Sequence, residues 1–194
     1  MSILKRMPPR RRRQGLTDYR KRYKLVKSGL PRLVVRRTNR YIIVQVVKSK
    51  AGGDETLLTV TSKKLAEYGW KAGFKNIPAA YLTGLLAGVL AGKKGVGKAV
   101  ADIGLHSPVP GSRVFAAIKG FRDAGVEVPA GEGVLPDDER LRGEHIKRYY
   151  EMLRGGGEAV DTPQFSRVPG EIYMNLDKHF EEVRERILGE ADGG

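Results

Sequence analysis

The stretch that decides the fold spans residues 32–47 and reads RLVVRRTNRYIIVQVV. Its two halves, residues 32–36 and 41–47, are rich in Val and Ile, as β-strands commonly are. The Thr38-Asn39 pair between them suits a tight turn. The second half opens with four apolar residues in a row, which indicates a strand covered on both faces. The sequence therefore predicts a β-hairpin whose second strand is buried.

Strands and helices alternate downstream of this hairpin. The expected order is a turn at 51–54, a strand at 56–61, a short helix at 63–68, a glycine-rich basic loop at 69–75, a long apolar helix at 77–92 capped by Asn76, a strand at 99–105, a helix at 112–124 and a candidate fifth strand at 126–128. A three-strand meander followed by helix–strand crossovers predicts an α/β protein, with a mixed sheet and helices on both faces.

The C-terminal third is predicted to be helical. A helix is expected from Asp137 to about residue 154, the glycines at 155–157 suit a hinge, residues 158–170 are irregular, and a last amphipathic helix covers residues 175–188. The apolar stripe of that last helix favours docking on protein; it consists of Leu176, Phe180, Val183 and Ile187. We therefore divide the chain into a basic N-terminal arm (1–15), an α/β core (16–130) and a helical extension (131–194).

Positive charge is concentrated at the N-terminal end. Residues 1–40 contain 15 Lys and Arg residues against one acidic residue, Asp18, so their formal charge of +14 equals that of the whole chain. We expect Pro8 and Pro9 to keep the arm non-helical, and a basic helix over residues 16–28 to begin near Asp18. A basic segment on a neutral body suits a polyanion, because each neutralised phosphate releases condensed counterions.

Composition excludes several classes of protein. The chain has no Cys, which rules out disulfide scaffolds, thiolate zinc sites and cysteine nucleophiles. The basic N-terminus is not followed by the apolar segment of a secretory signal. The longest weakly polar stretch, residues 77–92, has 16 residues, fewer than the ~20 that a membrane-spanning helix needs. We therefore expect a soluble protein without a membrane partner.

A phosphate loop is one alternative that the motifs leave open. Residues 92–98 read GKKGVGK and match the pattern G-x-x-x-x-G-K, but Ala99 stands where a Ser or Thr would hold magnesium. The match also follows a predicted helix and opens a predicted strand, which is the reverse of a phosphate loop. A turn that ends a helix is the simpler interpretation.

A metal-dependent nuclease is the other alternative, because the predicted sheet is similar to the ribonuclease-H-like fold. Nucleases of that plan hold two metal ions with several carboxylates. Here the first strand has no carboxylate, Asp102 is the single one on the fourth strand, and Asp137 and Asp138 suit helix N-caps. The histidines lack the spacing of metal ligands; they are His106, His145 and His179. We therefore expect no catalytic residues, metal or cofactor.

Basic and aromatic residues continue from the arm into the ordered elements. Arginine forks pair with phosphate and aromatic rings stack on unpaired bases. The aromatic candidates are Tyr19, Tyr23, Tyr41 and Trp70. Core packing is the alternative for each Tyr, most of all for Tyr23, and a solvated tail or a targeting signal is the alternative for the arm.

Four blocks of sequence, taken in their order, are similar to one known family. They are TDYRKRYKLVKSGLPRLVVRRTNRYIIVQVV at 17–47, NIPAAYLTGLLAG at 76–88, DIGLHSPVPGSRVFAAIKG at 102–120 and LPDDERLRGEHI at 135–146. Over residues 10–154 the chain resembles the archaeal-type family of universal large-subunit ribosomal protein eighteen, a family of 5S-rRNA-binding proteins. Residues 158–194 resemble it less distinctly.

The resemblance implies a ribonuclease-H-like α/β/α core without catalytic acids. It also implies a structural protein of the large subunit of the cytoplasmic ribosome. In the central protuberance, such a protein binds 5S rRNA, bridges it to the 23S-type rRNA and contacts neighbouring ribosomal proteins. It implies no small-molecule substrate.

Candidate RNA-binding residues follow from this resemblance together with the charge pattern. They are Arg10, Arg11, Arg12, Arg13, Tyr19, Arg20, Lys21, Arg22, Arg36, Arg37, Asn39, Arg40, Lys71, Lys75, Ser112 and Arg113. Arg140, Lys147 and Arg154 are spaced by sevens, and on one continuous helix they would share a side. We expect them to form a second, weaker RNA face.

Overall fold

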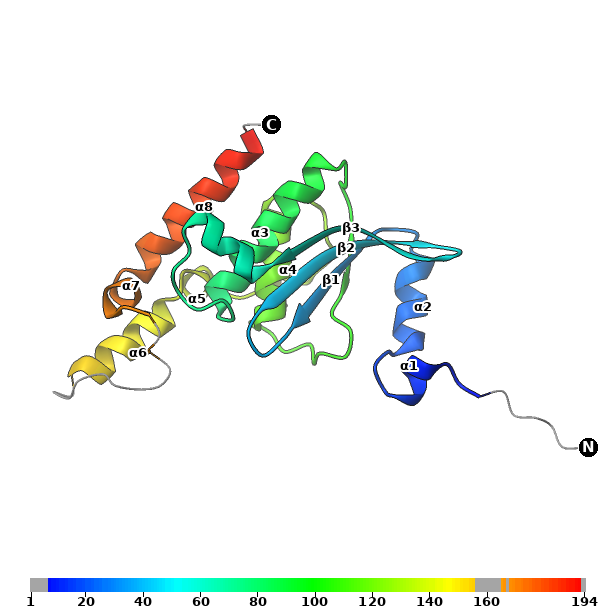
Figure 1. The fold of residues 1–194 in the computed structure, drawn as a ribbon, viewed down its shortest axis with the longest axis horizontal. Coiled ribbons are helices and arrows are strands. Elements are labelled where there is room, and N and C mark those ends of the chain that lie inside the picture. The colour runs from blue at the N-terminus through cyan, green and yellow to red at the C-terminus, as the bar shows by residue number, and fades with distance from the viewer. Residues whose placement is uncertain (1–6, 156–164, 167, 193–194) are drawn as a thin grey trace, which may run out of the picture.

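The protein is built on a four-stranded mixed sheet (Figure 1). The computed structural model describes residues 7–155, 165–166 and 168–192. The strands are β1 (Arg32–Arg37), β2 (Ile42–Lys50), β3 (Gly53–Thr61) and β4 (Val100–Asp102), in the order β3-β2-β1-β4. β1 and β3 both pair antiparallel to β2, and β4 lies parallel to β1. The predicted mixed sheet with a three-strand antiparallel meander is confirmed.

One face of the sheet carries the hydrophobic core. Along β2, Ile42, Val44 and Val46 are fully buried, whereas Ile43 and Gln45 are half-buried. This alternation follows from the two-residue period of a strand, because only one face lies under the two long central helices. The expectation that the start of this strand is fully covered on both faces is therefore wrong.

Helices α3 (Ile77–Lys93) and α4 (Arg113–Asp123) lie side by side on this inner face. As predicted, Asn76 caps α3, and its Oδ1 accepts a hydrogen bond from the Ala79 N–H at 2.9 Å. The two helices touch through their backbones. A Cβ atom placed on Gly84 would lie 2.0 Å from the Ala117 oxygen, and one on Gly120 would lie 2.1 Å from the Tyr81 oxygen. Glycine is required at this crossing because any side chain would push the helices apart.

The N-terminal segment lies on the opposite face of the sheet, so helices lie on both faces as expected, although the outer face of β2 stays half-buried. It consists of α1 (Arg10–Arg13) and α2 (Tyr19–Lys27). The arginine run is thus one helical turn that follows Pro9, and the prediction of a non-helical arm is wrong for these residues. Proline removes only its own N–H donor, which the start of a helix does not use. The first six residues of the predicted arm lie outside the described part of the chain.

Several predicted boundaries move in the structure. β3 begins at Gly53, so the hairpin turn is shorter than the expected 51–54. β4 has three residues, because Gly104 takes a φ of +61° and its N–H donates to Asp102 Oδ1, which turns the chain away. In place of a fifth strand, the described chain has a single parallel bridge between Lys98 and Glu127. The short helix predicted at 63–68 is the 3-10 helix η1 (Ser62–Tyr68).

The C-terminal region contains four helices in its described residues, preceded by the 3-10 turn η2 (Glu132–Val134). They are α5 (Asp138–Arg142), α6 (Glu144–Gly155), α7 (Gly170–Met174) and α8 (Leu176–Asp192). The predicted single helix from 137 to 154 is broken at Gly143, which takes a φ of +85°. The rest of the predicted hinge and most of the irregular segment 158–170 lie outside the described residues.

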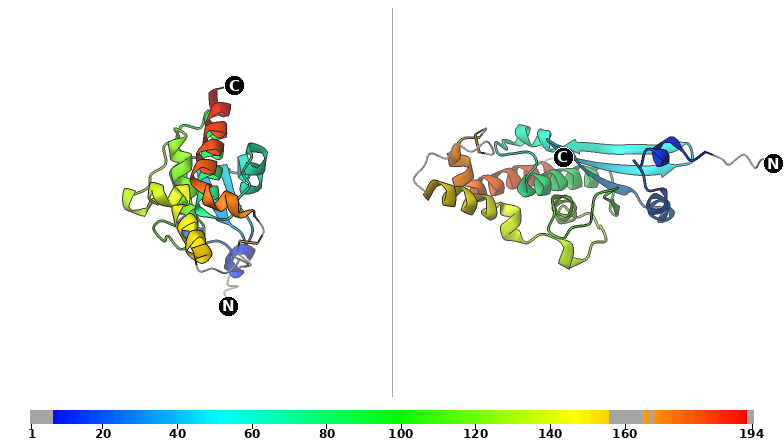
Figure 2. Two further views of the ribbon diagram at one scale, coloured as in Figure 1. Left: turned by 90° about the vertical axis from the view of Figure 1, so that its left-hand side faces the viewer. Right: turned by 90° about the horizontal axis from the view of Figure 1, so that it is seen from below.

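The last helix, α8, docks on the core as its sequence suggests. Its apolar stripe is at most 3% exposed and packs beside α3. The molecule is elongated, with α1 and α2 at one end and α6 and α7 at the other (Figures 1 and 2). Among the described helices, each is too short or too polar to cross a membrane.

Candidate RNA interface

The basic helix α2 begins at a well-formed cap. Asp18 Oδ1 accepts hydrogen bonds from the N–H groups of Arg20 (2.9 Å) and Lys21 (3.1 Å). The bond from Lys21 is the main reason why the pKa of Asp18 lies below its usual value. No residue of α2 is buried, so its cations face solvent along most of the helix. The one acidic residue of the N-terminal region therefore serves to hold the basic helix.

A groove of about 820 Å³ separates this N-terminal segment from the outer face of the sheet. Val34 and Gln45 belong to its sheet side, and Leu25 of α2 lies opposite them. Lys21 and Lys24 of the same helix add positive charge to the lining. The groove thus combines apolar surface from the sheet with cations from α2.

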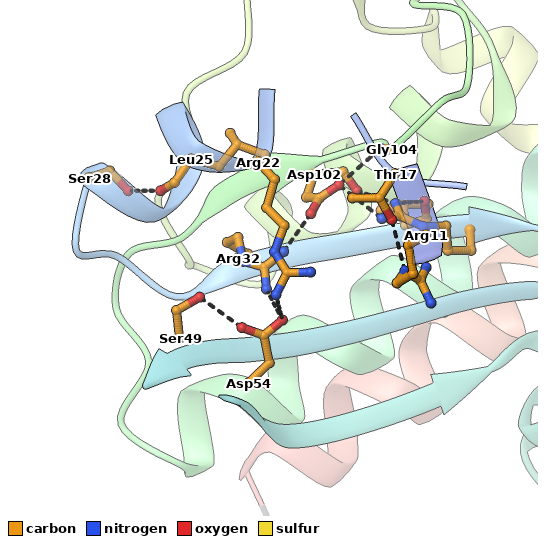
Figure 3. A network of polar contacts seen from close by, with 12 residues as sticks. Arg11, Thr17, Arg22, Leu25, Ser28, Arg32, Ser49, Asp54, Asp102 and Gly104 are labelled. Carbon is orange, nitrogen blue, oxygen red and sulfur yellow. Dashed lines mark hydrogen bonds and ion pairs between the residues drawn. The ribbon is translucent and has the colours of Figure 1, made fainter. Parts of the chain in front are cut away.

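A chain of ion pairs crosses this groove (Figure 3). Arg22 of α2 contacts Asp54 of β3 at 2.8 Å, and Arg32 of β1 contacts the same carboxylate oxygen at 2.5 Å. Arg32 also contacts Asp102 of β4 at 2.7 Å, and Arg36 of β1 contacts the other oxygen of Asp102 at 2.9 Å. Three arginines and two aspartates from four elements therefore form one connected network, with a net charge of +1.

The two carboxylates of this network stay ionised. Burial alone would raise the pKa of Asp102, but hydrogen bonds and charge from Arg36 and Arg32 outweigh it and hold the pKa below its usual value. At Asp54, hydrogen bonding and charge from Arg32 outweigh burial in the same way, and its pKa is also lowered. Both aspartates are therefore partners of arginine.

The tip of the β1–β2 hairpin presents further exposed cations. Thr38 closes the turn, because its N–H donates to the Tyr41 carbonyl at 2.9 Å and its hydroxyl accepts from the Tyr41 N–H at 2.9 Å. Asn39 and Arg40 are exposed at the tip. The Arg37 N–H donates to Nε2 of His106 at 3.1 Å, which joins the hairpin to the loop after β4.

His106 is neutral in this position. Its pKa is lowered by burial and by the charges of Arg37 and Arg36. Since a protonated ring could not accept the Arg37 hydrogen bond, the neutral form holds the loop against the hairpin.

The start of α4 lies close to the same hairpin. Arg113 donates a hydrogen bond from Nη1 to the Lys75 carbonyl at 3.2 Å. Burial and the charge of Arg37 lower the pKa of Arg113, so the two guanidinium groups are near each other. Ser112 is the N-cap residue, and within the described residues its buried Oγ has no hydrogen-bond partner. The structure therefore brings Arg37, Lys75 and the start of α4 together from separate parts of the sequence.

The comparisons with known proteins agree on one family. A family model described as ribosomal large subunit proteins 60S L5 and 50S L18 matches residues 5–97. A large ribosomal subunit protein uL18 of Staphylothermus marinus is 50% identical over 188 residues, which are 95% of this chain and 93% of that relative. The chain belongs to the uL18 family.

Other uL18 proteins are similar over nearly their whole length. The uL18 protein of Thermofilum pendens is 48% identical and covers 94% of both chains. That of Haloarcula marismortui is 46% identical and covers 94% of this chain and 93% of the relative. The protein is therefore a structural constituent of the large ribosomal subunit and not an enzyme, and its partners are rRNA and ribosomal proteins.

The site residues named from the sequence fall into three groups in this uL18 chain. Arg12, Arg20 and Arg40 are examples of the exposed cations, whereas Arg22 and Arg36 are bound by aspartates. Lys71 lies apart from the groove, next to α8, where its N–H donates to His179 Nε2 at 3.0 Å.

Two aromatic predictions are wrong. Trp70 is 2% exposed and stacks on His179 with the ring centres 5.1 Å apart, so it belongs to the core. Tyr23, for which core packing was the favoured interpretation, is 69% exposed on α2. Tyr19 and Tyr41 are half-buried. Helical spacing alone could not predict the exposure of Tyr23, because no residue of α2 is buried.

Sequence reasoning also missed Arg32 and Asp54 as members of the site. Arg32 is 4% exposed, and its Nε atom has no hydrogen-bond partner within the described residues. An arginine at an expected strand position, and an aspartate directly after a glycine turn, were the available signals.

The expected second RNA face rests on a helix that the structure divides. Arg140 lies on α5 and Lys147 on α6, and Gly143 between them changes the helix direction. Lys147 Nζ lies 3.4 Å from a carboxylate oxygen of Asp177 on α8. Arg154 lies on α6, but its side chain is outside the described part of the structure. The seven-residue spacing therefore does not place these cations on one continuous stripe.

The geometry gives no support to the two enzymatic alternatives. The residues 92–98 end α3, where Gly95 takes a φ of +74° and the Val96 N–H donates to the Ala91 carbonyl at 3.0 Å. This is a helix-ending turn. Across the described residues, no group of three or more His, Asp or Glu side chains is placed to hold a metal ion.

Proposed function

We propose that this protein binds 5S rRNA through its N-terminal end and bridges it to the 23S-type rRNA. The observation that carries the proposal is the collection of exposed cations at one end of an elongated molecule. The proposed RNA-binding residues are Arg10, Arg11, Arg12, Arg13, Tyr19, Arg20, Lys21, Arg22, Arg36, Arg37, Asn39, Arg40, Lys75, Ser112 and Arg113, with Lys71 apart from them beside α8. Arginine side chains bind phosphate with two parallel hydrogen bonds.

The bridge would use the opposite end of the molecule. The helices α5 and α6 lie far from α2 in the views of Figures 1 and 2. Arg140 is exposed on α5, and with Lys147 and Arg154 it supplies a smaller set of cations there. Neighbouring large-subunit proteins would contact the remaining surface. A molecule with cations at both ends can hold two RNA segments apart.

A gel-shift titration with purified 5S rRNA and tRNA as competitor tests the 5S assignment. If about six phosphates are neutralised, log K plotted against log[salt] should fall with a slope near −4 to −5, at about 0.7–0.9 per contact. Deleting residues 1–15 should weaken binding and leave the melting temperature nearly unchanged, because α1 has no buried residues. A slope shallower than about −2, or equal affinity for tRNA, would contradict the proposal.

A further inference from the structure

Besides Asp18, which caps α2, two further carboxylates line the proposed RNA-binding groove. Asp54 and Asp102 both line the groove between the N-terminal segment and the sheet. A negative charge there repels phosphate, so on charge alone each aspartate weakens RNA binding. Their contacts with arginine indicate a role that compensates for this repulsion.

Each aspartate holds two arginines at once. Asp102 binds Arg32 with one oxygen and Arg36 with the other, while one oxygen of Asp54 binds both Arg22 and Arg32. Arg32 is the buried centre of this chain of contacts. Ser49 donates a hydrogen bond to the second oxygen of Asp54 at 3.1 Å, which fixes that carboxylate as well.

The two outer arginines remain partly accessible. The side chains of Arg22 and Arg36 are 35% and 37% exposed, against 5% for Arg32. Within the described residues, the side-chain hydrogen bonds of Arg22 use only its Nη2 atom, so the other donors of its guanidinium are available to a ligand. Arg36 donates to Asp102 from Nη1 and Nη2 and to the Val35 carbonyl from Nη1, and no contact of its Nε is found in the described chain. Each guanidinium is therefore held by an aspartate along one edge and can donate hydrogen bonds to a ligand from another.

We propose that Asp54 and Asp102 are positioning residues of an RNA-phosphate site in this groove. They hold the guanidinium groups of Arg22 and Arg36 in place, and these groups receive backbone phosphates of the rRNA. A free arginine loses side-chain entropy when it is ordered. Arginines that are already held lose less on binding, which strengthens the contact. This inference rests on the proposed rRNA binding.

The direction in which Asp54→Ala changes RNA affinity distinguishes a positioning role from a simple effect of charge. Asp54→Ala removes a negative charge from the groove, so electrostatics alone predicts tighter RNA binding. If Asp54 positions Arg22, binding to 5S rRNA should instead weaken by about tenfold, the scale of one charge-assisted hydrogen bond. Glu127→Ala is the matched control, because it removes an exposed carboxylate that also forms an ion pair, with Lys98, outside the groove lining. The control should bind at least as tightly as the unchanged chain.

Arg22→Lys is the second variant, because it keeps the charge and loses the guanidinium fork. We expect a similar loss of 5S affinity with an unchanged salt slope. The double variant of Asp54→Ala and Arg22→Lys should lose little more than either single variant, since both act through the same contact. Full additivity of the two losses would overturn the proposal.

Amide hydrogen exchange of α2 in the RNA-free protein excludes a merely structural role for the ion pair. The proposal expects α2 protection to be retained in Asp54→Ala while 5S affinity falls. Loss of α2 protection in proportion to affinity would show that Asp54 only clamps the helix, and equal or tighter binding of Asp54→Ala would also overturn the proposal. If the unchanged chain fails to bind 5S rRNA, the proposed function itself is wrong.

Discussion

At the scale of single residues, Asp102 shows how one carboxylate is tied to its surroundings. It is 8% exposed as a side chain and contacts two arginines and the Gly104 N–H. In the nuclease alternative the same residue would bind a metal ion, but here its oxygens are occupied by Arg32 and Arg36. Its environment is therefore that of a structural ion pair.

Replacing this residue should change stability and not catalysis. Asp102→Asn should lower the free energy of unfolding by about 3–5 kcal/mol, because it leaves Arg32 buried with a weakened partner set. Urea denaturation measures this loss, with the exposed Glu127→Gln as a control expected within about 0.5 kcal/mol. No RNA cleavage should appear with magnesium or manganese in either protein. Metal-dependent cleavage that Asp102→Asn abolishes would contradict the structural role.

His179 is one residue through which pH should act on stability. Its Nε2 accepts the Lys71 N–H and its ring stacks on Trp70. Burial lowers the pKa of His179 below the usual 6.5, the charges of Lys71 and Arg186 act in the same direction, and Glu182 opposes them. Below about pH 6.5 the unfolded chain therefore binds more protons than the folded one, and stability should fall as the pH falls.

Melting temperatures at pH 7.5 and pH 5.5 test this dependence. The unchanged protein should melt lower at pH 5.5, and His179→Gln should show a smaller difference between the two values. Part of the difference should remain, because burial also lowers the pKa of His106 and His145. A protein that is equally or more stable at pH 5.5 would refute this account.

At the scale of elements, the crossing of α3 and α4 depends on glycine. Gly84→Ala should destabilise the protein by about 1–3 kcal/mol or more, because its Cβ would overlap the Ala117 carbonyl. The control is Gly189→Ala on α8, where a Cβ meets nothing within 4 Å. That change should stabilise by about 0.5–1 kcal/mol, since alanine favours a helix over glycine. Chemical denaturation measures whether the two variants change the free energy of unfolding in opposite directions. A stabilising Gly84→Ala would contradict the observed packing.

The C-terminal helices illustrate how one glycine changes an element. The cations of residues 137–154 suggest one helix with a basic side, yet Gly143 ends α5 in the left-handed region. A Cβ at Gly143 would also meet Leu176 at 2.7 Å, so α8 packs tightly against the break. The break between α5 and α6 thus combines the left-handed conformation of Gly143 with close packing against Leu176 of α8.

At the scale of the whole molecule, the two ends should bind their RNA partners independently of each other. The triple variant Arg140→Ala, Lys147→Ala, Arg154→Ala should keep its affinity for isolated 5S rRNA, because these residues lie far from α2 and distant sites contribute independently. It should incorporate poorly into large subunits, as measured by reconstitution and sedimentation. Loss of 5S affinity as severe as that caused by deleting residues 1–15 would refute the division into two surfaces.

Much of the architecture could be predicted from local patterns. The Val- and Ile-rich halves of residues 32–47 predicted β1 and β2, Asn76 predicted the start of α3, and the apolar stripe of α8 predicted its docking. These features depend on residues a few positions apart, and short-range periodicity reports them well. The position of the basic charge was equally plain in the sequence.

By itself, then, the sequence determined the mixed α/β class, the basic N-terminal end and the family resemblance. Only the tertiary structure decided which arginines are exposed and which are held. Arg32 and Asp102 are 70 positions apart in the chain, and Asp54 meets Arg22 only because α2 folds back over the outer face of the sheet. Pairing between charges so distant depends on how the elements pack, and no local pattern of residues contains that information.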